Sequence, residues 1–261
     1  MMHGLINHCF PTFIFLFYLI MFFSLSRVIS RFKHKISGNK EDVKTARAIV
    51  GSINSFYSIF LGFVVYILWS NYQKSSELIA TEATKLYVIG ESAKAFPSEV
   101  QQNIIQHLTQ YTSSILNDEL GAMSLGNESR RTQDASDQLY ATLLQFKPDS
   151  SIATYYNNTI TALNQAVEYR NLRLTMLHAG IPVAWYIIIF LGAFLVVGSY
   201  ALETDFKGRH FLAILCIFLA FYMTAITVLS FPFSGFAKVS DKPLQKVFNR
   251  LTHTNNKPSI V

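Results

Sequence analysis

The chain has 261 residues, of which 51% are hydrophobic and only 15% charged, whereas soluble domains carry about 25% charged residues. Four long windows contain no Lys, Arg, Asp or Glu, and each exceeds the roughly 20 apolar residues that cross a bilayer as a helix. This composition excludes a soluble enzyme and predicts a multi-pass protein of a cell membrane. The windows are Met1 to Ser26, Ala48 to Gln73, Leu174 to Leu202 and His210 to Ala237.

The charge distribution divides the chain into four segments. Residues 1–73 should form spans one and two with a basic loop, and residues 74–173, which hold 8 Lys or Arg against 11 Asp or Glu, an extramembrane helical bundle. Residues 174–237 should form spans three and four, and residues 238–261 a polar, basic and loosely ordered tail. We therefore expect an all-α membrane protein with a bundle inserted between spans two and three.

The bundle should grow out of the spans without a linker. No Gly or Pro occurs from Phe63 to Ile89, so span two should continue into the water as one helix to about Ala95. Apolar residues at steps of three and four predict further helices on either side of a loop at 121–127. The last helix should enter the bilayer as span three, with a kink at Gly180 and Pro182.

The basic residues next to the spans bear on topology. Counting the cations of the two short loops against those of the tail favours the loops inside and the bundle outside the cell. These cations need no nucleic-acid partner, because anionic lipid attracts juxtamembrane Lys and Arg. The first loop carries Arg27, Arg31, Lys33, Lys35, Lys40, Lys44 and Arg47, and the tail carries Lys238, Lys242, Lys246, Arg250 and Lys257.

Catalytic and metal-binding patterns are missing from the sequence. The seven histidines are dispersed with no pair at i, i+4, and we find no zinc spacing, phosphate-binding loop or nucleophile elbow. We therefore expect no enzyme, no metal and no cofactor.

Span two carries small and polar residues on an otherwise apolar helix. Steps of three and four connect them, so they should form one face: Gly51, Asn54, Ser55, Ser58 and Gly62. One interpretation is close helix packing, since Gly and Ser let backbones approach. The other is that copies of this face surround a water-filled path, where amide and hydroxyl groups replace an ion's hydration water.

Charges at the span ends form a second candidate site. Lys74 and Glu77 leave span two, and Arg170 and Arg173 precede span three. If the two helices pack together, all four side chains should lie in one layer near the membrane surface. That layer is either an ordinary salt-bridge layer or, in an oligomer, a charged ring at a pore mouth.

The order of these parts over about residues 46 to 245 resembles the bestrophin-like domain family of bacterial membrane proteins. The resemblance rests on short motifs: Trp69 and Tyr72 leading into Thr81-Glu82-Ala83, Arg170-x-x-Arg173-Leu174 before Ile181-Pro182, and Pro232-Phe233-x-Gly235 after span four. It implies similarity to bestrophins, which are pentameric anion channels whose second span lines the pore. It also implies a bacterial inner membrane and a cytosolic helical domain, the opposite of the topology from charge counting.

Two functional hypotheses follow. The first is an oligomeric ion channel in which span two lines the pore and the partners are lipid, further copies of the chain and permeating ions; the resemblance implies that the ions are anions. The alternative is a membrane sensor or adaptor whose helical bundle binds a ligand or partner, because a bundle between two spans is also how many receptors present a binding domain.

Overall fold

The computed structural model of the protein describes residues 10–36, 40–203 and 208–255. Every regular element within these ranges is helical. Four helices have the length and apolar composition to cross a membrane, and their spans are Pro11–Arg31, Val50–Ala95, Val183–Leu202 and Arg209–Leu229. The expected all-α class with four candidate membrane spans is confirmed.

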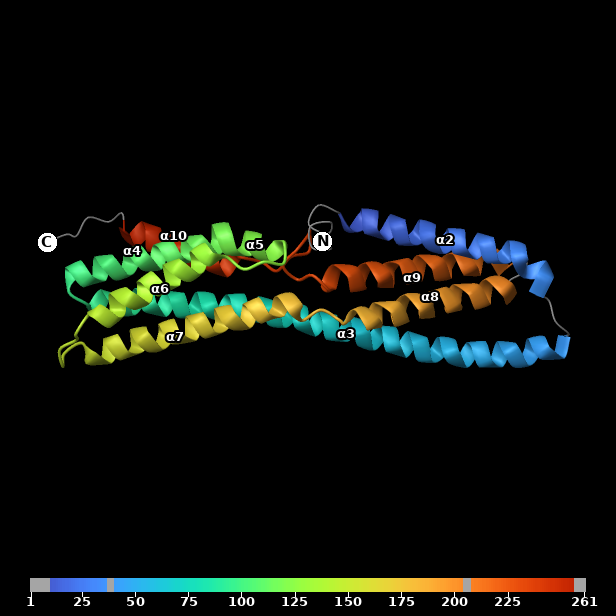
Figure 1. Ribbon diagram of the computed structural model, residues 1–261, viewed down its shortest axis with the longest axis horizontal. Helices are drawn as coiled ribbons and strands as arrows, with labels where there is room; N and C mark the ends of the chain where they lie inside the picture. The colour runs from blue at the N-terminus through green and yellow to red at the C-terminus, as the bar shows by residue number, and fades with distance from the viewer. Residues whose placement is uncertain (1–9, 37–39, 204–207, 256–261) are drawn as a thin grey trace.

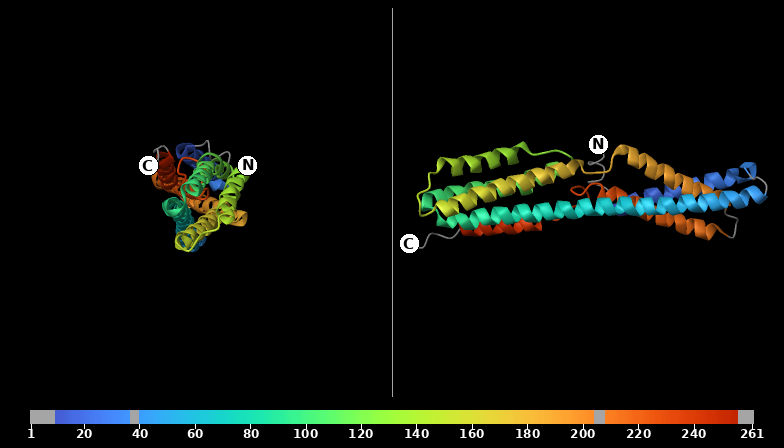
Figure 2. Two further views of the ribbon diagram at one scale, coloured as in Figure 1. Left: turned by 90° about the vertical axis from the view of Figure 1, so that its left-hand side faces the viewer. Right: turned by 90° about the horizontal axis from the view of Figure 1, so that it is seen from below.

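The molecule is elongated, and its two ends contain different helices (Figures 1 and 2). At one end, which we call the span end, α2 (Pro11–Ile36), α8 (Val183–Glu203) and α9 (Arg209–Leu229) lie beside the first half of α3 (Lys40–Ser92). At the other, distal end, the second half of α3 lies beside α4 (Ser98–Ser114), α5 (Leu120–Ser124), α6 (Arg130–Gln145), α7 (Ala153–Thr175) and α10 (Lys242–Asn255).

Helix α3 runs through both ends of the molecule (Figure 2). Its 53 residues give a length of about 80 Å at 1.5 Å per residue. A short 3₁₀ turn follows at Ala93–Ala95, and Phe96 is extended before Pro97. The expectation that span two continues unbroken to about residue 95 is confirmed, because no Gly or Pro interrupts the pattern before that point.

Each end has its own apolar core. The core of the span end includes Phe22 of α2, Val64 of α3 and Ile189 of α8, all fully buried. The core of the distal end includes Leu86 of α3 and Leu163 of α7. Because α3 contributes to both cores, the two ends are joined by one continuous helix.

The connection between α7 and α8 corrects the expectation of one kinked helix. α7 ends at Thr175, and α8 begins only at Val183, after a short 3₁₀ turn and a non-helical stretch. Pro182 lacks an N–H and disfavours helical torsions at the preceding residue, so the helix stops instead of bending. The side-chain amide of Asn71 on α3 donates a hydrogen bond of 2.8 Å to the Ala179 carbonyl, which gives that carbonyl of the break a partner.

The segment after α4 also differs from the sequence expectation. Instead of a loop from residue 121, a π-helical turn at Ile115–Glu119 leads directly into α5, and the chain turns only after Ser124. Gly126 then takes a positive φ of 82°, which glycine adopts without strain. The π turn carries one more residue per turn than an α-helix, and this shifts the direction of the side chains within it.

Residues 242–255 are helical, which corrects the expectation of a loosely ordered tail there. α10 packs on α3 and α4, with Leu244, Val247 and Leu251 buried against them. Their spacing of three and four places them on one face of the helix. The basic residue Lys257 and the loop side chains of Lys33, Lys35, Lys40, Lys44 and Arg47 lie outside the described residues.

Candidate functional site

Four of the five small and polar residues of span two lie on an open face of α3. Gly51, Ser55, Ser58 and Gly62 are all exposed, and a Cβ added at either glycine would meet nothing within 4 Å. The Ser55 hydroxyl donates to the Gly51 carbonyl at 3.0 Å, and the Ser58 hydroxyl donates to the Asn54 carbonyl at 2.9 Å. We call Gly51, Ser55, Ser58 and Gly62 the open stripe.

Asn54 lies toward the same side of the helix but differs from the other four residues in burial. Its side chain is only 9% exposed, and its amide nitrogen has no hydrogen-bond partner among the described residues. At about 100° per residue, the open stripe covers about 60° of the helix, and Asn54 lies to one side of it near Leu61. Leu61 is buried, so Asn54 lies at the edge of the packed face.

The packed face of α3 shows the close approach that small residues permit. The Tyr57 hydroxyl donates a hydrogen bond of 2.6 Å to the Ile189 carbonyl of α8. A Cβ added at Gly192 would collide with the Tyr57 ring. The glycine that admits a neighbouring helix is therefore on α8, and Gly51 and Gly62 of α3 have no such role within one chain.

Of the four candidate spans, α3 is the least covered by the rest of the chain. In its apolar window 11% of the residues are buried, against 17%, 22% and 33% in α2, α8 and α9. Phe56 and Ile59 are 74% and 71% exposed beside the open stripe. This face of α3 thus presents a small, polar strip next to a large apolar surface.

The four predicted pore-mouth charges separate into two groups. Lys74 and Glu77 pair with each other at 3.1 Å, and their side chains are 51% and 65% exposed. Arg170 and Arg173 are 1% and 0% exposed and pair with other carboxylates. Among the described residues, neither arginine pairs with Glu77, so two of the four charges are exposed and two are buried.

Arg173 lies at the centre of an ion network in the distal core. Its guanidinium donates to Glu82 of α3 at 2.8 Å and 3.1 Å and to Glu119 of the π turn at 2.7 Å. A further N–H points at the Met123 sulfur at 2.8 Å. The network connects α7 to α3 and to the segment between α4 and α5.

Arg170, one turn earlier on α7, completes this network. It donates to Glu119 through Nε at 2.8 Å and Nη2 at 2.6 Å, and its Nη1 donates to Gln133 of α6 at 2.6 Å. The two arginines and the two glutamates Glu82 and Glu119 cancel in charge. We call Glu82, Glu119, Arg170 and Arg173 the buried ion network.

The local electrostatics follow from burial and pairing. Burial alone would lower the pKa of Arg173, but the adjacent carboxylates of Glu82 and Glu119 raise it above its ordinary value. Burial raises the pKa of Tyr111, and the negative charge of Glu82 raises it further. The Tyr111 hydroxyl is fully buried beside these charges and has no hydrogen-bond partner among the described residues.

Sequence reasoning missed Glu82, Glu119 and Tyr111. A signal was present, because Glu82 shares a helical stripe with buried Leu78 and Leu86, and Arg170 shares one with buried Leu163 and Ala166. A charge within an apolar stripe indicates a buried group that needs a partner of opposite sign. Glu119 could not be placed this way, because the π turn changes which side of the helix it faces.

The fold and these contacts define a helical membrane protein with four candidate spans, one of which has an open polar stripe. In the described ranges, no group of three or more His, Cys, Asp or Glu could hold a metal ion. A family model for the Bestrophin-like domain matches residues 15–244. The chain therefore belongs to the Bestrophin-like domain family.

Solved structures support the same fold. Two crystal structures of a bacterial Bestrophin homolog from Klebsiella pneumoniae, one of them a mutant, are 12% and 13% identical to this chain, with TM-scores of 0.71 and 0.69. In both cases the similarity covers 93% of this chain and 99% of that chain. A crystal structure described as a membrane protein is 13% identical, with a TM-score of 0.69 over 93% of this chain and 98% of that one. No curated protein matches the sequence.

Proposed function

We propose that copies of this chain assemble into an ion channel of a cell membrane, with α3 lining the central path. The observation that carries the proposal is the open stripe. The Ser55 and Ser58 hydroxyls donate to carbonyls of their own helix, but one chain leaves their oxygens uncovered, and lipid offers those oxygens no hydrogen-bond donor. Facing copies of the stripe would place hydroxyl oxygens around a common axis, where they could replace hydration water. Family membership is consistent with this function.

The proposed assembly also gives the exposed apolar surface a partner. Phe56 and Ile59 lie to one side of the open stripe, away from the packed face, and are among the most exposed large side chains of the molecule. Neighbouring copies packed around the path would cover this apolar side of α3, because its opposite side already packs on α8 of the same chain. In this arrangement the bundle of α4 to α7 with α10 lies outside the bilayer, and the protein is multi-pass.

Only two of the predicted pore-mouth charges fit the proposed path. Glu77 is exposed on α3 beyond the open stripe and pairs with exposed Lys74. In an assembly these pairs would form a charged ring where the path leaves the membrane. Arg170 and Arg173 are assigned instead to holding the distal core together.

Two considerations bear on the charge of the permeant ion, and they favour opposite signs. The resemblance to bestrophins favours anions. In the structure, however, the Ser55 and Ser58 hydroxyls donate back to carbonyls of their own helix, which leaves oxygen lone pairs toward the open face. Lone pairs stabilise cations, so reversal potentials in asymmetric KCl and NaCl solutions should be measured with chloride and with an impermeant anion.

Flux through reconstituted protein tests the channel proposal. Ser58→Leu, which puts an apolar side chain into the open stripe, should reduce ion flux into liposomes by at least about tenfold, because a hydrophobic constriction loses its water. Ser24→Leu is the matched control, since Ser24 is an exposed serine on α2, and it should leave flux unchanged.

Two results would contradict the channel proposal. One is a purified protein that passes no ions under varied pH, calcium and voltage. The other is an oligomer in which the open stripe faces lipid. If in addition substitutions on the surface of the distal bundle abolish function while Ser58→Leu does not, the sensor or adaptor hypothesis is the better one.

A further inference from the structure

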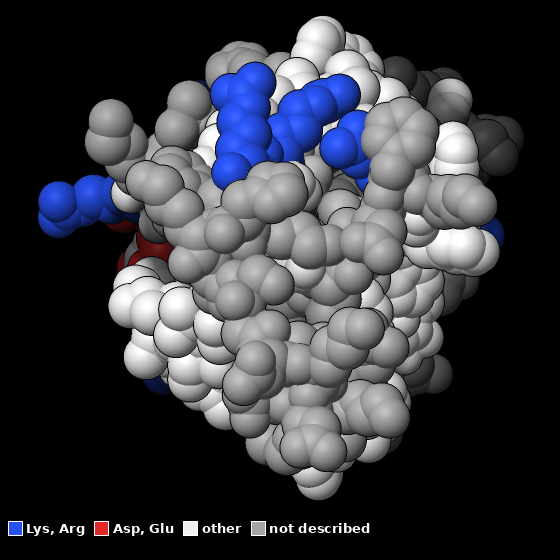
Figure 3. Space-filling model, turned by 90° about the vertical axis from the view of Figure 1, so that its right-hand side faces the viewer, with Lys and Arg blue, Asp and Glu red and all other residues white. Residues whose placement is uncertain are grey.

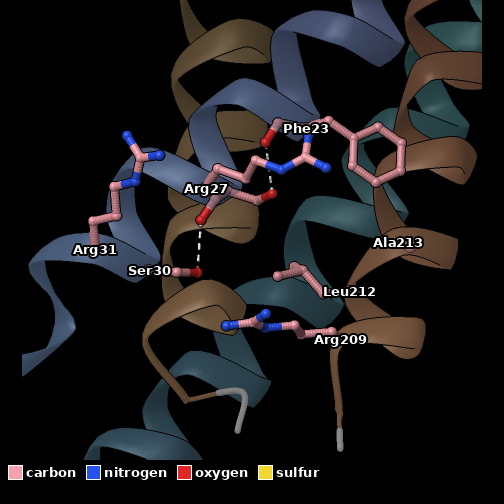
Figure 4. A pocket seen from close by; sticks show the side chains of 8 residues that line it. Phe23, Arg27, Ser30, Arg31, Arg209, Leu212 and Ala213 are labelled. Carbon is pink, nitrogen blue, oxygen red and sulfur yellow. Dashed lines mark hydrogen bonds between the residues drawn. The ribbon is translucent and has the colours of Figure 1, made fainter. Parts of the chain in front are cut away.

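A cavity between α2 and α9 at the span end is not part of the proposed path. It has a volume of about 440 Å³, within the range of small-molecule sites. Three arginines line it: Arg27 and Arg31 from α2, and Arg209 from the first turn of α9. Figure 4 shows Arg209 reaching from α9 toward α2, with Arg27 and Arg31 extending from α2 on the other side of the space.

The lining changes from basic to apolar within this cavity. Leu212 and Ala213, one turn further along α9, form its apolar side together with Phe23 of α2. Arg27 is the first charged residue after the apolar window of α2, and α9 is apolar from Phe211 onward. The arginines therefore lie at the depth where a lipid headgroup meets its acyl chains.

Two features bring positive charge to the lining of the cavity, the arginine side chains and the start of α9. In the described part of the chain, neither Arg27 nor Arg31 pairs with a carboxylate. The 21-residue helix α9 begins at Arg209 and has no acidic residue in its first turn, so its N-terminal N–H groups and dipole add to the charge of the arginines. Basic side chains also gather along one edge of this face of the molecule (Figure 3).

The Ser30 side chain shows that hydroxyl groups are available at the same place. It lines the cavity and donates a hydrogen bond of 2.7 Å to the Ser26 carbonyl one turn earlier, so its oxygen can also accept a hydrogen bond from a hydroxyl group or from a protonated phosphate. Guanidinium groups match phosphate oxygens through paired N–H donors. The cavity thus combines three arginines, a helix N-terminus and an apolar wall. These features suit an anionic group that is attached to apolar substituents, or one that is small enough to occupy the polar part alone.

We propose that this cavity binds a phosphate group, supplied either by the headgroup of an anionic phospholipid or by free phosphate. Basic pockets between transmembrane helices hold lipid headgroups in this way. The apolar wall of Leu212 and Ala213 would contact the glycerol and first acyl carbons of a lipid. The proposal does not depend on ion conduction, because the cavity and the open stripe involve different helices.

Native mass spectrometry of the full chain tests the lipid source. The protein is reconstituted in nanodiscs of phosphatidylcholine with and without phosphatidylglycerol, and retained phosphatidylglycerol is counted per chain. We expect the wild type to retain it, and the triple variant Arg27→Gln, Arg31→Gln, Arg209→Gln to bind it at least about tenfold more weakly. The control removes the same charge from α10 and its approach, with Lys238→Gln, Lys242→Gln and Lys246→Gln, and should retain the lipid.

Inorganic phosphate tests the other source. In phosphatidylcholine nanodiscs, phosphate that raises the unfolding temperature of the wild type but not of the triple variant identifies free phosphate as the ligand. Equal retention of phosphatidylglycerol by wild type and triple variant, together with no effect of phosphate on either, would overturn the proposal. An equal loss in the α10 control would also overturn it, because the attraction would then be general.

A second variant keeps the test decisive if the triple variant does not fold. Ala213→Phe leaves all three arginines in place and fills the apolar side of the cavity, and Ala213 is partly exposed, so the helix core is not disturbed. We expect this variant to lose the bound phosphatidylglycerol while keeping the unfolding temperature of the wild type in phosphatidylcholine alone. Undiminished retention would count against the cavity as the binding site.

Discussion

Along the single helix α3, the serines of the open stripe face outward in the span end, whereas the carboxylate of Glu82 faces inward in the distal end. Ser55 and Ser58 lie on an open surface, whereas Glu82, about seven turns further along, is fully buried and paired with Arg173. The same helix thus meets two different requirements. The distal end pairs its buried charges within one chain, whereas the hydroxyl oxygens of the open stripe keep lone pairs that only water or other chains can satisfy.

The largest expected effect comes from breaking the buried ion network. Arg173→Leu removes the partner of Glu82 and leaves a buried carboxylate unpaired, so the free energy of unfolding should fall by about 3–5 kcal/mol. The measurement is thermal unfolding of the purified protein. Arg131→Ala is the control, because Arg131 is 80% exposed in its pair with Asp118, and this variant should change stability by less than about 1 kcal/mol.

Replacing the whole network sharpens this prediction. A variant with Glu82→Leu, Glu119→Leu, Arg170→Met and Arg173→Met leaves no charge unpaired, so it should be more stable than Arg173→Leu alone. If both variants lose the same stability, the charges matter through packing and not through their pairing.

Two glycines of the span end should respond oppositely to the same change. Gly192→Ala places a Cβ against the Tyr57 ring, and such overpacking should cost about 1–3 kcal/mol. Gly62→Ala meets nothing within 4 Å in one chain and should leave the stability of the monomer unchanged or slightly raised, since Ala favours helix more than Gly. Unfolding in detergent, where subunits are separated, gives the comparison, and a large loss for Gly62→Ala would show that α3 is packed on both faces.

The unpaired hydroxyl of Tyr111 predicts a gain in stability. Tyr111→Phe removes a fully buried polar atom without a hydrogen-bond partner in the described residues, so the free energy of unfolding should rise by about 1 kcal/mol. A measured loss of similar size would mean that the hydroxyl has a bound water or another partner in solution.

The smallest effect should come from the start of α7. Asp149 accepts hydrogen bonds from the Ser151 hydroxyl and from the Ser151 and Ile152 backbone N–H groups. These bonds, that of the hydroxyl most of all, hold the pKa of Asp149 below its ordinary 3.8. Because this pKa is lower in the folded than in the unfolded protein, ionised Asp149 stabilises the folded state above pH 3.8. This stabilisation is lost as pH falls through the lowered pKa.

Unfolding temperatures measured from neutral pH into acid test the contribution of these Asp149 hydrogen bonds. Asp149→Ala should unfold slightly earlier than the wild type at neutral pH, and the difference should close in acid below the pKa. Asp134→Ala is the control, since Asp134 is exposed on α6 and makes none of these contacts. A difference that persists unchanged in acid would show that the carboxylate charge is not involved.

Much of the fold was predictable because it depends on local patterns. The uncharged windows give the four candidate spans, and the absence of Gly and Pro after Phe63 gives the uninterrupted α3. The break before α8 was predicted only as a kink, since Pro182 shows where a helix is disturbed but not how far it opens. The α10 helix was missed because its apolar residues are few and lie among charges.

The candidate site was only partly predictable, for a geometric reason. Small residues at steps of three and four predicted the open stripe, but Asn54 lies just outside it, where a shift of a few tens of degrees separates a packed face from an open one. Arg170 and Arg173 were predicted in a layer near the membrane surface, either a salt-bridge layer or a pore-mouth ring. Their pairing with Glu119 was not predictable, because a π turn that no local pattern indicates brings Glu119 to them.

The sequence by itself determined where the chain is apolar, how long its helices run and which residues are small or charged on each face. These properties depend on residues a few positions apart. The tertiary structure alone decided which charges are buried together, because Glu82, Glu119 and Arg173 come from three segments far apart in the chain. It also decided which face of α3 is left uncovered, since that depends on where α8 and α9 pack.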